Sequence, residues 1–123
     1  PEIDVMEAHG HLVSGYWATV HWRETSGAPQ EQGFRIRTPD LTEDFHDFGV
    51  EWGPQHILWT FDGRVVARAP TPASLRKPMY MVVNLAVGGK WPGDPDASTH
   101  FPAKFHVQRV QAYRLDAHPE MSP

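Results

Sequence analysis

The chain has 123 residues, which is enough for one domain and too few for two. It contains no cysteine, which excludes disulfide bonds, thiolate metal sites and cysteine nucleophiles. Eleven Lys and Arg against 15 Asp and Glu give a formal net charge of −4, so the chain lacks the excess of basic residues that is typical of nucleic-acid binders. No apolar run approaches the ~20 residues of a membrane span, and no membrane association is expected.

The first element is an acidic strand over residues 2–7, with the sequence EIDVME. In an extended strand Glu2 and Asp4 share one face, whereas strict alternation places Glu7 on the opposite, apolar face. One extra residue, a bulge around Val5–Met6, returns Glu7 to the face of the other two acids. Repulsion among three carboxylates on one face raises the pKa of at least one, which suits one proton donor and one ionised nucleophile.

Two other interpretations of this strand are open from the residues alone. One is a solvent-facing edge strand with incidental acids, because such a short pattern often arises by chance. The other is a metal site with His9 and His11, although a barrel of the cupin type needs a Glu a few residues later. Gly15 and Tyr16 stand there instead, and neither a metal nor a cofactor is expected.

Further strands follow the acidic one in the first half of the chain. Residues 16–22 alternate cleanly, with Trp17, Thr19 and His21 on the face opposite an apolar one. A weak strand is predicted over residues 34–37, and a further strand over residues 45–52.

The second half of the chain begins with a hairpin. Asp62-Gly63, between apolar runs over residues 57–67, favours a type I′ turn that sets Thr60 opposite Val65 and Trp59 opposite Val66. His46, Trp52 and Trp59 are interpreted as packing and sheet-pairing residues.

Two more strands are predicted after the hairpin. Residues 79–87 are apolar except for Asn84 and indicate a central strand covered on both faces. A last strand is predicted over 105–115, and residues 116–123 form a polar tail. Strands joined by turns, without helices between them, predict an all-β domain of antiparallel sheets over residues 1–115.

Four stretches in this order resemble glycoside hydrolase family 16, whose members include laminarinases, mixed-linkage glucanases and bacterial exopolysaccharide glycanases. The acidic strand is similar to the family's catalytic strand in its bulged E-x-D-x-x-E form. The other three stretches are TVHW (19–22), DFHDFGVEW (44–52) with Trp59 and Asp62-Gly63 after it, and NLAVGGKWPG (84–93).

This resemblance implies a jelly-roll β-sandwich of the concanavalin type, with a substrate groove across a concave sheet. It also implies a retaining endo-β-glycanase that hydrolyses internal β-1,3 or mixed β-1,3-1,4 bonds of a polysaccharide. By analogy, Glu2 is the nucleophile and Glu7 the acid/base, while Asp4 tunes protonation and holds Glu2. A retaining mechanism needs its two carboxyl groups about 5–5.5 Å apart, and two glutamates that flank a bulge on one strand can lean together over such a gap.

Four other residues are candidate substrate-binding residues. The resemblance places His21 beside the carboxylates, whereas a lone His on a strand is otherwise a bystander. Trp17 shares that face and lies either at the groove or in the core. Trp91, in a Gly/Pro loop, suits stacking on a pyranose, and Asn84 either satisfies a backbone group or reaches a sugar hydroxyl.

The sequence departs from the family's pattern in two ways. Gln108 and Arg109 stand where the family's last strand carries a calcium-binding aspartate, so no calcium is expected. The family's domain is also about twice as long, with the acidic strand near its middle. The chain therefore resembles the C-terminal half of that domain, and a swapped copy or a partner chain is one source of the other strands.

Two further functions stay open from the sequence, namely a non-catalytic glycan-binding module of the same fold and a transglycosylase. All three acids are present, which favours an enzyme over a binding module. Some transferases of the family that the chain resembles carry the unbulged form of the acidic strand, so the resemblance favours hydrolysis over transfer. A polysaccharide substrate implies a secreted or periplasmic protein.

Overall fold

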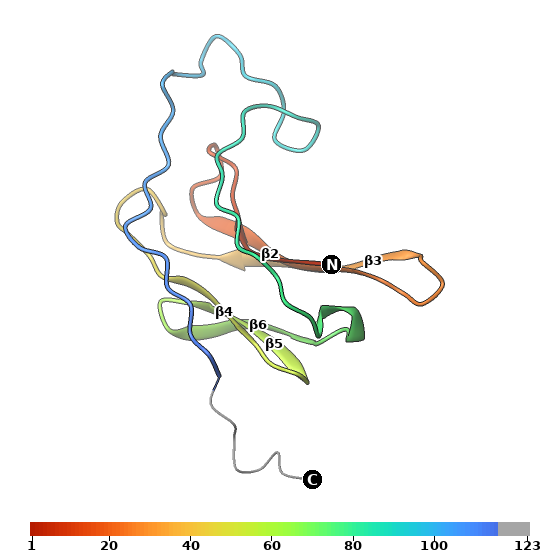
Figure 1. Ribbon diagram of the computed structural model, residues 1–123. Helices are drawn as coiled ribbons and strands as arrows, with labels where there is room; N and C mark the ends of the chain where they lie inside the picture. The colour runs from red at the N-terminus through yellow and green to blue at the C-terminus, as the bar shows by residue number, and fades with distance from the viewer. Residues whose placement is uncertain (116–123) are drawn as a thin grey trace. The chain divides into compact units, whose positions relative to one another are not determined.

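The computed structural model describes residues 1–115 (Figure 1). The chain consists of two compact units, one of residues 1–79 and one that begins at Tyr80. The tail predicted over residues 116–123 lies outside the described residues. Within residues 1–115, no helix has the length and apolarity needed to cross a membrane.

The first unit contains two antiparallel three-stranded sheets, ordered β1-β2-β3 and β4-β5-β6, which stack as two layers (Figure 1). Its elements are β1 (Glu2–Glu7), β2 (Gly15–Arg23), β3 (Pro29–Arg37), β4 (Phe48–Trp52), β5 (His56–Phe61), β6 (Arg64–Pro70) and the short 3-10 helix η1 (Ala73–Leu75). The sequence predicts β3 only from Phe34, because the polar run Pro29–Gln32 lacks a strand-like pattern. The structure extends β3 to Pro29, since it pairs with the whole of β2.

The core lies between the two sheets. Tyr16, Ala18 and Val20 of β2 face it, as the alternation predicts. They pack with the other buried apolar residues, which are Ile36, Ile57, Trp59, Ala67, Ala69 and Leu75. The opposite face of the first sheet, with Trp17, Thr19 and His21, is therefore directed away from this core.

The predicted hairpin is present, with one correction to its register. Asp62 (φ 47°) and Gly63 (φ 76°) both adopt positive φ, as a type I′ turn requires. Thr60 pairs with Val65 as predicted, but Trp59 pairs with Ala67 and not with Val66. A bulge between Trp59 and Thr60 adds one residue on the β6 side and shifts the register.

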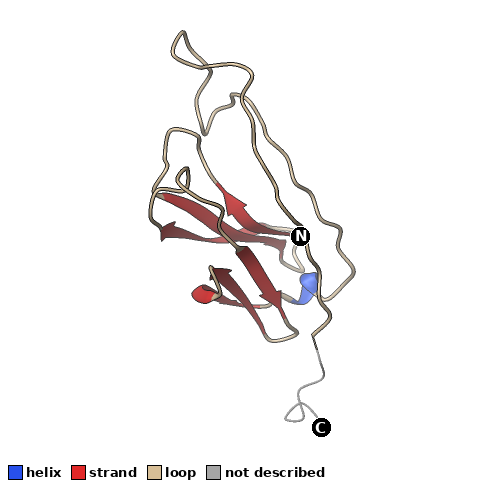
Figure 2. Cartoon of the chain, turned by 90° about the vertical axis from the view of Figure 1, so that its left-hand side faces the viewer, coloured by secondary structure: helices blue, strands red, loops and turns tan. Residues whose placement is uncertain are grey.

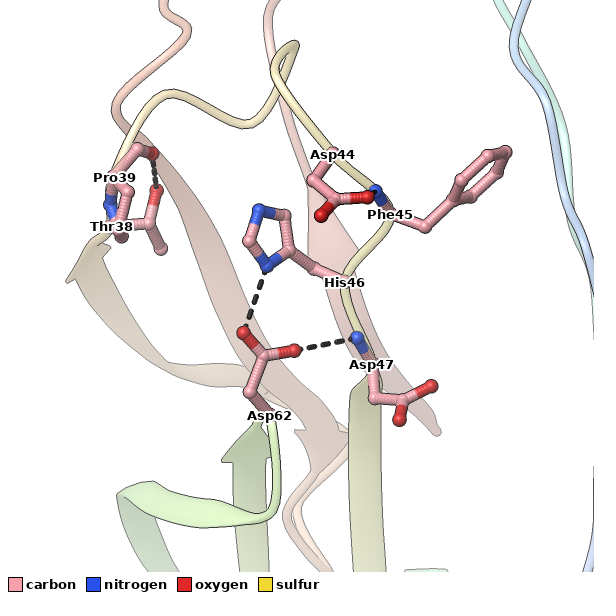
Figure 3. Close-up of polar contacts among 7 residues, drawn as sticks. All are labelled: Thr38, Pro39, Asp44, Phe45, His46, Asp47 and Asp62. Carbon is pink, nitrogen blue, oxygen red and sulfur yellow. Dashed lines mark hydrogen bonds and ion pairs between the residues drawn. The ribbon is translucent and has the colours of Figure 1, made fainter.

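The side chain of Asp62 ties this turn to the segment before β4 (Figure 3). One carboxylate oxygen accepts the backbone N–H of Asp47 at 2.9 Å, and the other lies 2.8 Å from Nδ1 of His46. The N–H of Asp47, and then His46, lower the pKa of Asp62. His46, predicted to be a packing residue, also stacks on Phe61 with ring centroids 4.9 Å apart.

The second unit contains neither a helix nor a strand within its described residues, 80–115 (Figure 2). The strands predicted over 79–87 and 105–115 are therefore wrong for these residues. Strand structure requires a hydrogen-bonded neighbour, and no ladder involves residues 80–115. Val82 and Val83, which an extended chain directs to opposite sides, are 69% and 56% exposed, so neither face of this segment is covered.

Candidate active site

The face of the first sheet that points away from the core carries an ordered array of polar side chains, which we call the acidic face. Strand pairing sets these residues in three rows across β1, β2 and β3. The rows are Glu2, His21 and Glu31; Asp4, Thr19 and Gly33; and Glu7, Trp17 and Arg35. The three acids of the sequence pattern therefore lie on the same face as His21 and Trp17.

The third acid reaches this face through the predicted bulge. Asp4 pairs with Thr19 and Glu7 with Trp17, so three steps along β1 match two steps along β2. The extra residue returns Glu7 to the side of Asp4. The charge of Glu7 accordingly acts on Asp4.

The carboxyl group with the raised pKa is that of Asp4, whose side chain is only 14% exposed. The pKa of Asp4 is raised from 3.8 to about 7, mainly by burial and then by the charges of Glu7 and Glu2 and by a hydrogen bond with the Glu2 side chain, whereas His21 acts in the opposite direction. Near neutral pH, Asp4 is therefore the acid of this strand that is poised to carry a proton. A protonated Asp4 donates a hydrogen bond to the Glu2 carboxylate.

His21 lies between two carboxylates. Its Nε2 is 3.0 Å from Oδ2 of Asp4, and its Nδ1 is 3.3 Å from Oε2 of Glu31. The predicted place of His21 beside the acids is thus seen in the structure. Glu31 was not predicted, because it belongs to the part of β3 that the local pattern does not indicate, and only the pairing with β2 brings it to His21.

Trp59 reaches the acidic strand from the other sheet. Its indole N–H donates to the backbone oxygen of Asp4 at 3.0 Å, and its side chain is fully buried. This bond anchors β1 at the residue where the bulge begins. The packing role predicted for Trp59 is therefore incomplete, because its side chain also makes this hydrogen bond. The bond was not predicted, since no local signal relates a hairpin residue to a strand 55 positions earlier.

Trp17 is half-buried beside Glu7 on the acidic face. The Arg35 guanidinium lies 5.2 Å from the centre of its ring, and the His9 ring lies 5.0 Å from it. Of the two positions left open by the sequence, the structure places Trp17 on the face with the acids and not in the core. Its contact with substrate stays a prediction.

Asn84 and Trp91 belong to the second unit, and their roles as substrate-binding residues also stay predictions. Both side chains are exposed, Trp91 by 53%. Trp91 lies in a loop in which Gly88, Gly89 and Gly93 adopt positive φ. The loop is closed by a hydrogen bond from the Gly93 N–H to the Gly89 oxygen at 2.9 Å.

The raised pKa of Asp4 predicts an unusual dependence of stability on pH. Asp4 holds its proton more tightly in the folded chain than in the unfolded one, so its stabilising effect is complete below about pH 4 and is lost as pH rises through about 7. We expect Asp4→Asn to gain stability relative to the wild type between pH 4 and 7, on the order of 1 kcal/mol per pH unit. Urea unfolding of the full-length protein at several pH values measures this difference.

Asp40→Asn is the matched control. Hydrogen bonds with Thr42 lower the pKa of Asp40, so its contribution does not change between pH 5 and 8. If the difference between Asp4→Asn and wild type were equally flat over that range, the proton assigned to Asp4 would be ruled out.

Comparison with known proteins points to one family. The family model described as "Glycosyl hydrolases family 16" matches residues 1–109. The endo-1,3-1,4-beta-glycanase EglC of Rhizobium meliloti is 44% identical over 117 residues, which are 95% of this chain and 24% of that protein. A beta-glucanase of Rhodothermus marinus is 34% identical over 129 residues, covering 92% of this chain and 44% of that protein.

Solved structures give the same result. An endo-beta-1,3-glucanase from Pyrococcus furiosus matches with a TM-score of 0.67 and 38% identity, over 81% of this chain and 42% of that one. The laminarinase catalytic domain from Thermotoga maritima matches with a TM-score of 0.65 and 31% identity, over 80% of this chain and 44% of that one. The chain thus spans about a quarter of the length of EglC and less than half of the length of the other three proteins.

Proposed function

The chain belongs to the glycosyl hydrolases of family 16, and from that premise we propose that the protein is a retaining endo-β-glycanase. It hydrolyses internal β-1,3 or mixed β-1,3-1,4 bonds of a polysaccharide by a double displacement that uses two carboxylates. The observation that carries this proposal is the bulge in β1, which brings Glu2, Asp4 and Glu7 to one face of the sheet.

Glu2 and Glu7 perform the two steps of the proposed reaction. In the first step, the Glu2 carboxylate forms a bond to the anomeric carbon while Glu7 gives its proton to the departing glycosidic oxygen. In the second step, Glu7 takes a proton from water, the water oxygen bonds to the anomeric carbon, and the bond to Glu2 breaks. Both inversions together retain the β configuration.

Asp4 lies between these two residues and controls the charge of the strand. When Asp4 carries the proton, it donates to the Glu2 carboxylate and so holds it in place for attack. A neutral Asp4 also no longer repels the carboxylates on either side of it. The same hydrogen bond weakens as Glu2 loses its charge to the glycosyl ester, so Asp4 also favours departure of Glu2 in the second step.

The proposed substrate class is a β-glucan that contains β-1,3 bonds. Supporting this class, the names of the relatives specify 1,3-1,4-beta-glycanase and endo-beta-1,3-glucanase activity. Polymers of this kind do not cross a membrane, so we also propose that the protein acts as a secreted or periplasmic enzyme.

The test uses the full-length protein and four polymers, namely a linear β-1,3-glucan, a mixed-linkage β-glucan, a β-1,4-glucan and an acidic bacterial polysaccharide. We expect release of reducing ends from the first or second, with the β anomer formed first in the proton NMR spectrum. An α anomer would disprove retention. Binding without turnover would indicate a glycan-binding module, and products longer than the substrate would indicate a transglycosylase.

We further propose that additional strands of the same sandwich cover residues 80–115. The side chains of Tyr80, Val82 and Val83 are exposed, and this segment has no partner strand within the described residues. An exposed apolar segment without a partner strand favours edge-to-edge association. The purified 123-residue chain is expected to self-associate or to melt without cooperativity in light scattering and thermal unfolding. A swapped dimer would show that a second copy supplies the cover, whereas a cooperative monomer would contradict the proposal.

A further inference from the structure

Trp59 belongs to the sheet that carries none of the three acids, yet its indole N–H donates to the backbone oxygen of Asp4 at 3.0 Å. We propose that Trp59 is a positioning residue, which holds the bulge of β1 in the conformation that sets Glu7 on the acidic face. This inference deepens the proposed function of that face and rests on it. It follows from one hydrogen bond between the two sheets and from the register of β1 on β2.

The indole of Trp59 is a fixed donor. Trp59 is fully buried and pairs within its own sheet with Val50 on one side and Ala67 on the other. Its ring also packs against Phe34 of the first sheet, with ring centroids 5.5 Å apart. An indole N–H only donates, and a buried donor without an acceptor bears the full cost of its desolvation. The ring therefore holds its acceptor, the Asp4 oxygen, at one place beside the core.

The accepting oxygen belongs to the first peptide group of the bulge. The register of β1 on β2 is regular up to Asp4 and shifts between Asp4 and Glu7, and the Asp4 oxygen lies on the peptide that joins Asp4 to Val5. Because a peptide group is planar, fixing this oxygen fixes the plane through which the chain leaves Asp4. Ladder bonds direct a carbonyl toward a neighbouring strand, whereas Trp59 draws this oxygen toward the core. The bond therefore favours the bulge over continued regular pairing.

The packing of β1 agrees with this conformation. Ile3 and Met6 both pack against the core although they are three residues apart, so one extra residue lies between them. Regular pairing would instead direct Glu7 to the core and Met6 to the acidic face. The bond from Trp59 and the packing of Met6 therefore favour the same register.

Loss of the Trp59 N–H should displace Glu7 more than Glu2. Glu2 pairs with His21 before the bulge, and this pairing does not involve the peptide that Trp59 holds. Glu7 follows the bulge, so its carboxyl group moves when that peptide turns. Cleavage of a polymer depends on proton transfer from Glu7, whereas a nitrophenyl glycoside needs little protonation. The effect on the rate should therefore depend on the leaving group.

An isosteric replacement of Trp59 removes the donor from the full-length protein without a cavity. Benzothienylalanine has a sulfur atom in place of the indole N–H and is introduced at this one position by stop-codon suppression. We expect kcat/KM on the best β-glucan to fall by about 10- to 100-fold, since small misplacements of catalytic groups have effects of this size. The first step on a nitrophenyl glycoside should fall by less than about threefold. Trp59→Phe also lacks the N–H and should show the same preference, with an added loss of stability from its smaller ring.

The same replacement at Trp52 is the matched control. Trp52 lies on β4 and packs against the same core, but its side chain makes no hydrogen bond within residues 1–115. Benzothienylalanine at this position removes no bond to β1. It should leave the ratio of the rates on the two substrates unchanged.

Nuclear Overhauser effects in the full-length protein give a readout that does not depend on turnover. In the wild type they should join Glu7 to Trp17 across the strands, and the indole proton of Trp59 to the backbone of Asp4. The protein with benzothienylalanine in place of Trp59 should lose the effects between Glu7 and Trp17. It should keep the effects between the regular part of β1, before the bulge, and β2.

With both readouts, the two proposals fail separately. An inactive wild type in which the effects between Glu7 and Trp17 depend on the Trp59 N–H would contradict the proposed hydrolase and leave the role of Trp59 intact. An active wild type without effects between the Trp59 indole proton and Asp4 would overturn the inference. Equal losses on both substrates, with the effects between Glu7 and Trp17 retained, would also overturn it. Failure of both variants to fold would likewise assign Trp59 to the core alone.

Discussion

Glu2→Gln abolishes hydrolysis of the polymer if Glu2 is the nucleophile. The amide has the same shape and still accepts a hydrogen bond from Asp4, but it lacks the charge that forms the glycosyl ester. We expect kcat to fall by on the order of 10⁴-fold or more, as for the loss of other covalent nucleophiles. Reducing-sugar release by the full-length protein on its best β-glucan measures this effect.

Two further measurements make this prediction specific to Glu2. Glu43→Gln, an exposed glutamate in the loop before β4, should retain wild-type activity. Glu2→Ala leaves room for a small anion, so azide should restore turnover of an activated aryl glycoside and yield an α-glycosyl azide. A β-glycosyl azide from this variant, or activity of Glu2→Gln within tenfold of the wild type, would refute the assignment.

Local sequence patterns predicted the parts of the site that lie on single strands. The acidic strand follows from period-two alternation and one bulge, because a buried Glu7 carboxylate is too costly for the regular alternative. The placement of Trp17, Thr19 and His21 follows from the alternation of β2 in the same way. The type I′ turn follows from Asp62-Gly63, since both positions need positive φ.

The parts of the site that depend on distant pairing were not predictable in this way. Glu31 meets His21 only through the register of β2 and β3, and Trp59 meets Asp4 only through the stacking of two sheets. The hairpin prediction failed at Trp59 for a similar reason, because a bulge on β6 leaves no distinct sequence signal. Residues 79–87 have the composition of a central strand, but composition does not supply the neighbouring strands that such a strand requires.

Loss of the acid/base gives a result that depends on the leaving group. Glu7→Gln removes the proton donor, so a polymer, whose alkoxide leaves poorly without a proton, should be hydrolysed about 10²- to 10⁴-fold more slowly. An aryl glycoside with a nitrophenolate leaving group needs little protonation, and its first step should be nearly unaffected. Comparison of kcat/KM on the two substrates, in the wild type and in Glu7→Gln, measures the difference.

The second step provides the decisive check on Glu7. Without a base to activate water, the glycosyl ester on Glu2 should accumulate, which gives a burst of nitrophenolate followed by slow turnover. Azide needs no base and attacks from the side that Glu7 and the leaving group occupied, so in Glu7→Ala it should accelerate turnover and yield a β-glycosyl azide. Opposite azide anomers from Glu2→Ala and Glu7→Ala would place the two carboxylates on opposite sides of the anomeric carbon. Equal losses on both substrates in Glu7→Gln, without a burst, would show instead that Glu7 is not the proton donor. Asp4 would then be the next candidate, because its pKa is raised to about 7.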